Sequence, residues 1–203
     1  MIDKKATTQW EKAAVSYTNY AKYIQSKADK FELTLVDLLY ISNFKGGNST
    51  INEDEFIAKT KLKKYSKALR EIEAEFSSRN LAELNDKEVK ELIEKVKTLC
   101  YLTKKNTDSK IDGFSISYLS ALANCYFPNL LPILDRRVLI NIGIVTRQEI
   151  DKQGQIIDIE RFYEPLILEM RKKSSSENKT LRQIDKELFV IKIPKEKRIA
   201  DED

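Results

Sequence analysis

The sequence has 203 residues, of which 41% are apolar and 33% are charged. This length and apolar fraction suffice for a hydrophobic core, which excludes a disordered chain. Thirty-six Lys and Arg against 32 Asp and Glu give a net charge of +4, which permits nucleic-acid binding without indicating it. With two cysteines and no histidine, the chain cannot form a disulfide scaffold, the common zinc and haem sites, or a histidine-dependent catalytic triad. Metal chemistry is then restricted to Mg²⁺ or Mn²⁺ bound by carboxylates. We expect no metal and no cofactor.

The apolar residues form no uninterrupted run near the ~20 that a membrane-spanning helix needs. The first residues also lack the pattern of a signal peptide. These two observations predict a cytoplasmic protein without a membrane partner. They leave the oligomeric state open.

Glycine and proline are scarce, with five and four occurrences, which argues against a sheet-rich fold with many tight turns. Apolar residues instead recur at steps of three and four, as expected for amphipathic helices. A loop is expected at 42–50, a polar linker at 172–180, and a kink at Pro165. In chain order, the predicted helices cover residues 10–24, 35–41, 52–76, 85–100, 116–126, 135–142, 156–170 and 181–188. The prediction is an all-α fold in a single compact multi-helix domain over 1–203, or in two lobes with 110–147 at the centre.

Charge is distributed unevenly along the chain. Residues 57–110 contain 14 Lys and Arg against 9 Asp and Glu, which indicates either solvated helix faces or a nucleic-acid patch. Residues 113–147 contain only four charged side chains in 35 positions, and three of these are the consecutive Asp135, Arg136 and Arg137. We interpret this nearly uncharged segment as the centre of the protein.

Two short stretches belong to this part of the chain. KIDGFSIS at 110–117 overlaps the start of the uncharged segment, and PILDRRV at 132–138 lies within it. A glycine turn, an apolar helix, a proline-bounded connection and an aspartate follow one another in that order. This arrangement resembles the helix-hairpin-helix superfamily of DNA glycosylases. In that family a Leu-Pro-Gly-Val-Gly hairpin precedes an apolar helix, and the catalytic aspartate follows in a Val-Asp-Thr-His-Val-like stretch. The resemblance is local and covers residues 110–144.

The resemblance implies that Asp135 is the catalytic aspartate and that Gly113, Phe114 and Ser115 occupy the hairpin. Ser115 replaces the second glycine, which restricts how closely the backbone can approach a phosphate. Ser117 stands where family members with lyase activity have a nucleophilic lysine, which argues against Schiff-base chemistry. Arg136 and Arg137 replace the usual Thr-His pair and are expected to bind phosphate or a core carboxylate.

A turn before a helix exposes backbone N–H groups that can bind a phosphate oxygen, and the nucleic-acid-binding set is therefore centred on Gly113, Phe114, Ser115 and Ser117. A base has to be flipped out of the duplex before an enzyme reaches it. Its sugar then becomes positively charged, and a carboxylate stabilises that charge or assists water. The loop side chains Lys45, Asn48 and Ser49 offer further DNA contacts. Candidate rings for stacking are Tyr118, Tyr126, Phe114 and Phe44.

The same residues also allow purely structural interpretations. Asp135 is a good N-cap for the helix that follows it, and Gly113 can serve only to turn the chain. Cys100 and Cys125 lie on apolar faces and are expected to be inert core residues. Three hypotheses remain: a monofunctional DNA glycosylase acting on double-stranded DNA with a modified or damaged base, a non-catalytic nucleic-acid-binding module, and a helical protein-interaction or phage-defence component.

Overall fold

The structure is a computed structural model that describes residues 1–46 and 50–193. Within this part of the chain, eight α-helices and three short 3-10 helices are joined by loops, and the only β pairing consists of two isolated bridges. The α-helices are α1 (Lys4–Ser26), α2 (Leu35–Phe44), α3 (Glu55–Phe76), α4 (Asp86–Tyr101), α5 (Ile116–Tyr126), α6 (Arg136–Ile142), α7 (Tyr163–Glu177) and α8 (Leu181–Val190). The predicted all-α class is confirmed.

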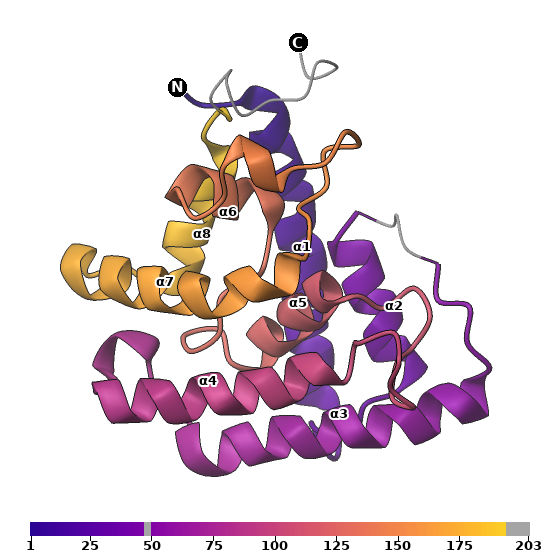
Figure 1. The fold of residues 1–203 in the computed structure, drawn as a ribbon. Coiled ribbons are helices and arrows are strands. Elements are labelled where there is room, and N and C mark those ends of the chain that lie inside the picture. Colours follow the sequence, from indigo (N-terminus) through magenta and orange to yellow (C-terminus); the bar gives the residue numbers. More distant parts are fainter. Residues whose placement is uncertain (47–49, 194–203) are drawn as a thin grey trace.

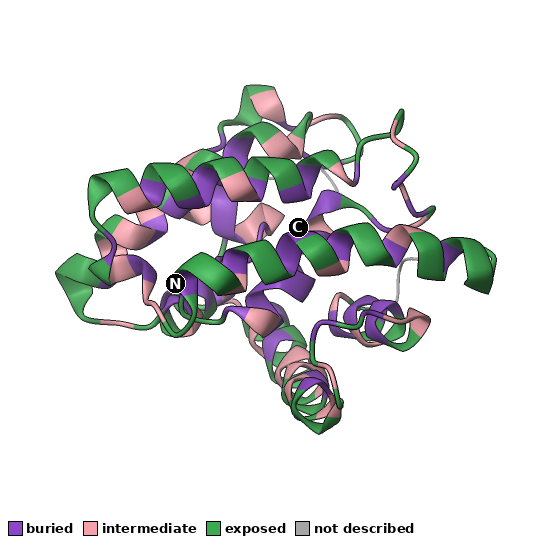
Figure 2. Ribbon diagram, turned by 90° about the horizontal axis from the view of Figure 1, so that it is seen from below, coloured by how far each residue is buried: buried purple, intermediate pink, exposed green. Residues whose placement is uncertain are grey.

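Helix α5 lies in the middle of the molecule and packs against α1 and α2, while α3 and α4 lie side by side (Figure 1). The long helices have buried inner faces and exposed outer faces (Figure 2). Buried apolar side chains from Tyr20 to Ile193 form one continuous cluster. The uncharged sequence of α5 follows from this position, because eight of its eleven residues are buried.

The start of α2 shows how a local sequence signal determines a helix boundary. Asp37 accepts a hydrogen bond of 2.7 Å from the backbone N–H of Thr34, as the carboxylate of a capping box does. The same buried carboxylate accepts from the Tyr20 hydroxyl at 2.9 Å and from Lys27 Nζ at 3.1 Å. These contacts attach α2 to α1, so the cap is also part of the tertiary packing.

Several predicted boundaries, and one predicted kink, differ from the structure. Helix α2 continues through Phe44, so the loop begins at Lys45 instead of at residue 42. The N-cap of α3 is Asp54, whose carboxylate accepts from the N–H groups of Phe56 and Ile57. The expected linker at 172–180 is helical as far as Glu177. The kink predicted at Pro165 does not occur within a helix. Helix α7 begins at Tyr163, so Pro165 lies in its first turn, where no intrahelical N–H is required.

Residues near both ends of the described chain bind to α6. The side chain of Arg137 donates to Asp3 at 2.8 Å, to the Phe189 carbonyl at 2.8 Å and to the Ile191 carbonyl at 3.0 Å. An antiparallel bridge joins Ile2 to Ile191. Residues 1–3 and 189–191 therefore hold α6, the helix that follows Asp135, in place.

Candidate functional site

Asp135 is the N-cap of α6, as its sequence context predicts. Its Oδ1 accepts from the N–H of Arg137 at 2.9 Å, and its Oδ2 accepts from Lys45 Nζ at 3.1 Å. Burial opposes ionisation of this carboxyl, but the charge and hydrogen bond of Lys45 outweigh it and lower the pKa of Asp135 below its ordinary value. Asp135 is therefore ionised at neutral pH, and its side chain remains 21% exposed.

The Asp135 carboxylate lines a cavity of about 560 Å³, which we call the Asp135 cavity. Its walls come from α1, the end of α2, the 133–135 segment and α8. Three aromatic residues contribute, Trp10, Phe44 and Phe189, and Lys45 lies beside the carboxylate. The cavity thus combines one fixed negative charge with apolar, flat surfaces.

Helix α8 contributes a second carboxyl group to the same cavity. Asp185 is 5% exposed, and its Oδ2 accepts from Arg182 Nη1 at 2.9 Å. Burial raises the pKa of Asp185 to about 7; Arg182 opposes this increase, whereas the negative charge of Asp135 adds to it. The two carboxyl groups therefore differ in protonation near neutral pH, which is typical of acid and base pairs in catalytic sites.

The guanidinium of Arg182 lies over aromatic rings on α1 and α2. Its Cζ is 3.8 Å from the centre of the Trp10 ring, 4.5 Å from that of Tyr17 and 5.7 Å from that of Phe44. Such cation–π contacts hold the guanidinium in a fixed orientation. Arg182 is thus positioned by α1 and α2, although its backbone belongs to α8.

Arg182 and Asp185 were not predicted from the sequence, although one signal for Asp185 is present in it. Leu181, Ile184 and Leu188 define the apolar face of α8, and Asp185 falls on that same face at the i+4 position from Leu181. A carboxyl on an apolar stripe is unusual, because burying a charge is costly unless the charge is paired.

Gly113 adopts a positive φ of 77°, which the turn before α5 requires. This turn is not a short connection between two helices, because α4 ends at Tyr101 and residues 102–115 precede α5. Ser115 is the N-cap of α5 and makes no side-chain capping hydrogen bond. The Ser117 hydroxyl donates to the Leu134 carbonyl at 2.9 Å, which attaches the first turn of α5 to the residue before Asp135.

The side chain of Phe114 does not serve as a stacking surface, because it is fully buried and its ring meets that of Tyr65 at a centroid distance of 5.9 Å. Tyr126 stacks on Phe31 and donates its hydroxyl to the Lys30 carbonyl. Of the four rings proposed from the sequence, Phe44 is the one that lines the Asp135 cavity.

The two arginines after Asp135 bind protein atoms. Arg136 Nη1 donates to the Gly154 carbonyl at 2.7 Å. Arg137 binds Asp3, a half-buried carboxylate outside the core, and two backbone carbonyls. Lys45 is directed to Asp135. Asn48, together with Ser49, lies outside the described residues.

A second cavity, of about 540 Å³, lies at the start of α5 and is lined by Lys105, Lys110 and Ser115, among other residues. Lys110 Nζ donates to the Phe114 carbonyl at 2.7 Å. Lys104, which also lines this cavity, forms an ion pair of 3.0 Å with Glu160. Asp158 and Glu160 line the same cavity, so the positive charge at the start of α5 is partly neutralised.

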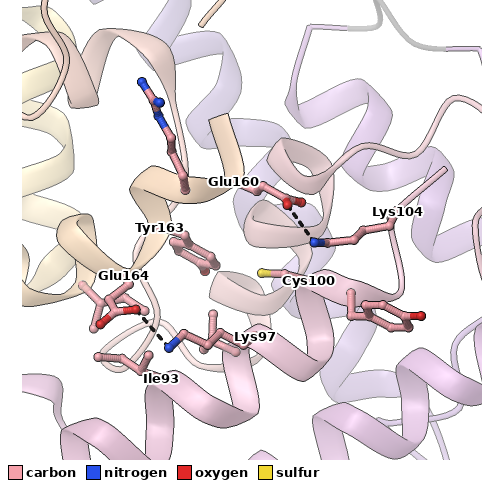
Figure 3. Close-up of a pocket in the computed structure, with 11 residues that line it drawn as sticks. Ile93, Lys97, Cys100, Lys104, Glu160, Tyr163 and Glu164 are labelled. Carbon is pink, nitrogen blue, oxygen red and sulfur yellow. Dashed lines mark ion pairs between the residues drawn. The ribbon is translucent and has the colours of Figure 1, made fainter. Parts of the chain in front are cut away.

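A third cavity, of about 390 Å³, lies between α4 and α7 (Figure 3). Cys100 and Tyr163 lie between two ion pairs there, Lys97 with Glu164 at 3.1 Å and Lys104 with Glu160 at 3.0 Å. Burial raises the pKa of the Cys100 thiol to about 12, and burial also raises that of Cys125. Neither thiol forms a thiolate at neutral pH, so neither cysteine is a nucleophile there, as expected for core residues.

Comparisons with protein-family models, with curated proteins and with solved structures find no match for this chain. Within residues 1–46 and 50–193, no three His, Cys, Asp or Glu side chains are grouped so that they could hold a metal ion. No helix in this part of the chain is both long and apolar enough to span a bilayer. The assignment of a function therefore depends on the contacts around Asp135.

Proposed function

We propose that this protein binds DNA and acts as a monofunctional N-glycosylase on a modified base that is flipped into the Asp135 cavity. The observation that carries the proposal is the ionised carboxylate of Asp135 at a cavity lined by Trp10, Phe44 and Phe189. A volume of about 560 Å³ falls within the range of roughly 300–1,000 Å³ typical of small-molecule sites. Aromatic walls suit a planar base.

In the proposed reaction, the bond between the base and the sugar breaks and positive charge develops on the sugar. The Asp135 carboxylate stabilises that charge or accepts a proton from the attacking water. Lys45 keeps this carboxylate ionised and fixes its orientation through the 3.1 Å contact. With Ser117 at the position of the family's lysine, the proposal involves hydrolysis without a Schiff base.

DNA backbone contact is assigned to the first turn of α5. A helix N-terminus attracts phosphate through its free N–H groups and its dipole, and Lys105 and Lys110 lie at the same cavity. The Ser117 hydrogen bond to the Leu134 carbonyl connects this turn to Asp135. A phosphate held there would be linked through one contact to the segment that positions the carboxylate.

The test uses DNA duplexes that contain uracil or an alkylated, oxidised or glucosylated base. Each duplex is incubated with the wild type and with Asp135→Asn, and abasic sites are detected by alkaline strand cleavage. Asp54→Asn is the matched control, because it makes the same substitution at the N-cap of α3. We expect abasic sites from the wild type and the control but not from Asp135→Asn.

Ser115 favours a second candidate, a DNA-binding module without catalysis, because it stands where the resembled hairpin has a glycine. Salt-dependent DNA binding without abasic sites from any duplex would identify this module. If the wild type neither binds DNA nor releases a base, both proposals fail and a helical interaction or phage-defence protein remains.

A further inference from the structure

Arg182 and Asp185 form an ion pair in the Asp135 cavity that is joined by a single hydrogen bond. Arg182 Nη1 donates to Asp185 Oδ2 at 2.9 Å. The other terminal nitrogen, Arg182 Nη2, is buried and has no hydrogen-bond partner among the described residues. The described part of the chain also provides no hydrogen bond to Asp185 besides that of Arg182. Each partner thus keeps unused hydrogen-bonding capacity.

This incomplete pairing is costly for the free protein. A buried guanidinium nitrogen without an acceptor loses its hydration and gains no hydrogen bond in return. The second carboxylate oxygen of Asp185 has no hydrogen bond within the described residues but is not fully buried, so it is open to the cavity. The arrangement persists because Trp10 and Tyr17 hold the guanidinium by stacking. Fixed but unsatisfied polar groups in a cavity are typical of a site that a ligand completes.

The aromatic lining of the cavity favours a planar ligand. The Trp10 and Phe189 rings pack against each other, with centroids 5.6 Å apart and a tilt of 52°, so a ligand would lie against this aromatic wall and not between the two rings; Phe44 lines the same space. Flat apolar surfaces favour a planar ring system, whereas the donor and acceptor of the ion pair select the edge of that ring.

We propose that the Arg182–Asp185 pair reads the edge of a planar nitrogen heterocycle in which a ring N–H stands next to a carbonyl. The N–H donates to Asp185, and the neighbouring carbonyl accepts from Arg182. Guanine, hypoxanthine, uracil and thymine present this edge. The inference rests on the proposed function for the choice of a nucleobase as the ligand, and it adds the class of base that the cavity accepts.

The pair also explains which bases are rejected. Adenine and cytosine present a ring nitrogen lone pair next to an amino group, so that the lone pair would face the Asp185 carboxylate. A site built to bond an N–H discriminates strongly against a ligand that lacks it, because its own polar groups are then left unpaired. Methylation of the ring nitrogen removes the same hydrogen bond and adds a steric clash.

Trp10 provides the readout, because it is the single tryptophan of the chain and lines the cavity. Its fluorescence is followed while the protein is titrated with 2′-deoxyguanosine, 1-methyl-2′-deoxyguanosine and 2′-deoxyadenosine, and calorimetry repeats each titration. At pH 8 we expect 2′-deoxyguanosine to bind at least about tenfold more tightly than the other two. Equal affinity for all three nucleosides, or no binding of any, overturns the proposal.

Asp185→Ala tests the residue itself, and Asp54→Ala is the control with the same change outside the cavity. Circular dichroism and urea unfolding verify that each variant folds. We expect Asp185→Ala to lose the preference for 2′-deoxyguanosine and the control to keep it. If Asp185→Ala fails to fold, Asp185→Asn replaces it with the same expectation of weaker discrimination. Retained preference in a folded variant overturns the proposal.

The outcome is separable from that of the proposed function, because nucleoside binding requires neither DNA nor hydrolysis. A wild type that discriminates between nucleosides but releases no base supports the inference and contradicts the glycosylase. A wild type that releases bases from DNA with the same selectivity as Asp185→Ala supports the glycosylase and overturns the inference.

Discussion

Lys45 Nζ lies 3.1 Å from Asp135 Oδ2, although 90 positions separate the two residues in the sequence. The contact brings the end of α2 against the start of α6, and it is shielded, with side-chain exposures of 13% and 21%. A carboxylate that loses such a partner remains in a poorly hydrated position. Lys45 therefore affects both the stability of the chain and the protonation of Asp135.

Lys45→Gln removes the positive charge and retains part of the side-chain volume. We expect the free energy of unfolding to fall by about 1–3 kcal/mol at pH 7, as measured by urea unfolding. Because the folded pKa of Asp135 is lowered, its ion-pair stabilisation is present above the ordinary value of 3.8 and is lost as the pH falls through the lower folded pKa. The free energy of unfolding of Lys45→Gln should fall less than that of the wild type over this acid range. An identical acid profile for the two proteins would contradict this account.

Asp135 has a capping role and a proposed catalytic role, and two substitutions separate them. Asparagine is also a good N-cap, so Asp135→Asn should keep the capping hydrogen bond and lose only the ion pair with Lys45, about 1–3 kcal/mol of unfolding free energy. Asp135→Ala should lose about 1 kcal/mol more than the asparagine variant. Base release should be absent from both Asp135→Asn and Asp135→Ala. Activity that follows stability across the wild type and the two variants would show that Asp135 acts only as a cap.

The stability contributed by Asp185 depends on pH in the opposite direction to that contributed by Asp135. Its pKa is raised from 3.8 to about 7, so the folded chain binds this proton more tightly than the unfolded chain. Its stabilisation is complete below pH 3.8 and is lost as the pH rises to about 7. We expect the wild type to lose ~2–4 kcal/mol relative to Asp185→Asn between pH 4 and pH 8. Urea unfolding of both proteins across this range measures the difference, and parallel profiles would contradict the raised pKa.

Ser117 and Ser120 both contact Leu134, through different backbone atoms. Ser117 donates to the Leu134 carbonyl at 2.9 Å, whereas Ser120 accepts from the buried Leu134 N–H at 2.9 Å. Ser117→Ala should cost about 1 kcal/mol of unfolding free energy, and Ser120→Ala about 1–3 kcal/mol, because it leaves a buried N–H without an acceptor. Chemical denaturation of the two variants compares them. The reverse order would show that the Leu134 N–H finds another acceptor.

The sequence predicts much of the helical framework because the signals for it are local. The bounds of α5 and the start of α4 at Asn85 were correct, since apolar spacing and capping residues act within a few positions. The end of α7 was wrong because a run of Lys, Ser and Glu is polar enough to resemble a linker, whereas these side chains lie on a helix that is buried on its other face.

The site was only partly predictable, for the opposite reason. Asp135 and Lys45 were each identified, but nothing local indicates that they meet. Arg182 and Asp185 were not predicted, because the apolar positions that define the last helix do not show which of its polar residues are buried. The pKa of Asp185 depends on burial and on Asp135, which lies 50 positions earlier, so it follows from the tertiary structure and not from the residue type.

Residues 1–3 and 189–191 act as a clasp on α6, through Asp3, Arg137 and the bridge between Ile2 and Ile191. Removal of residues 1–3 would take away Asp3 and the bridge to Ile191, which leaves Arg137 bound only to the carbonyls of Phe189 and Ile191 and loosens the helix that Asp135 caps, without reaching the cavity itself. Purification tags and fluorescent labels attached beside this clasp carry the same risk. Exposed positions on the outer face of α3 or α4 are safer points of attachment.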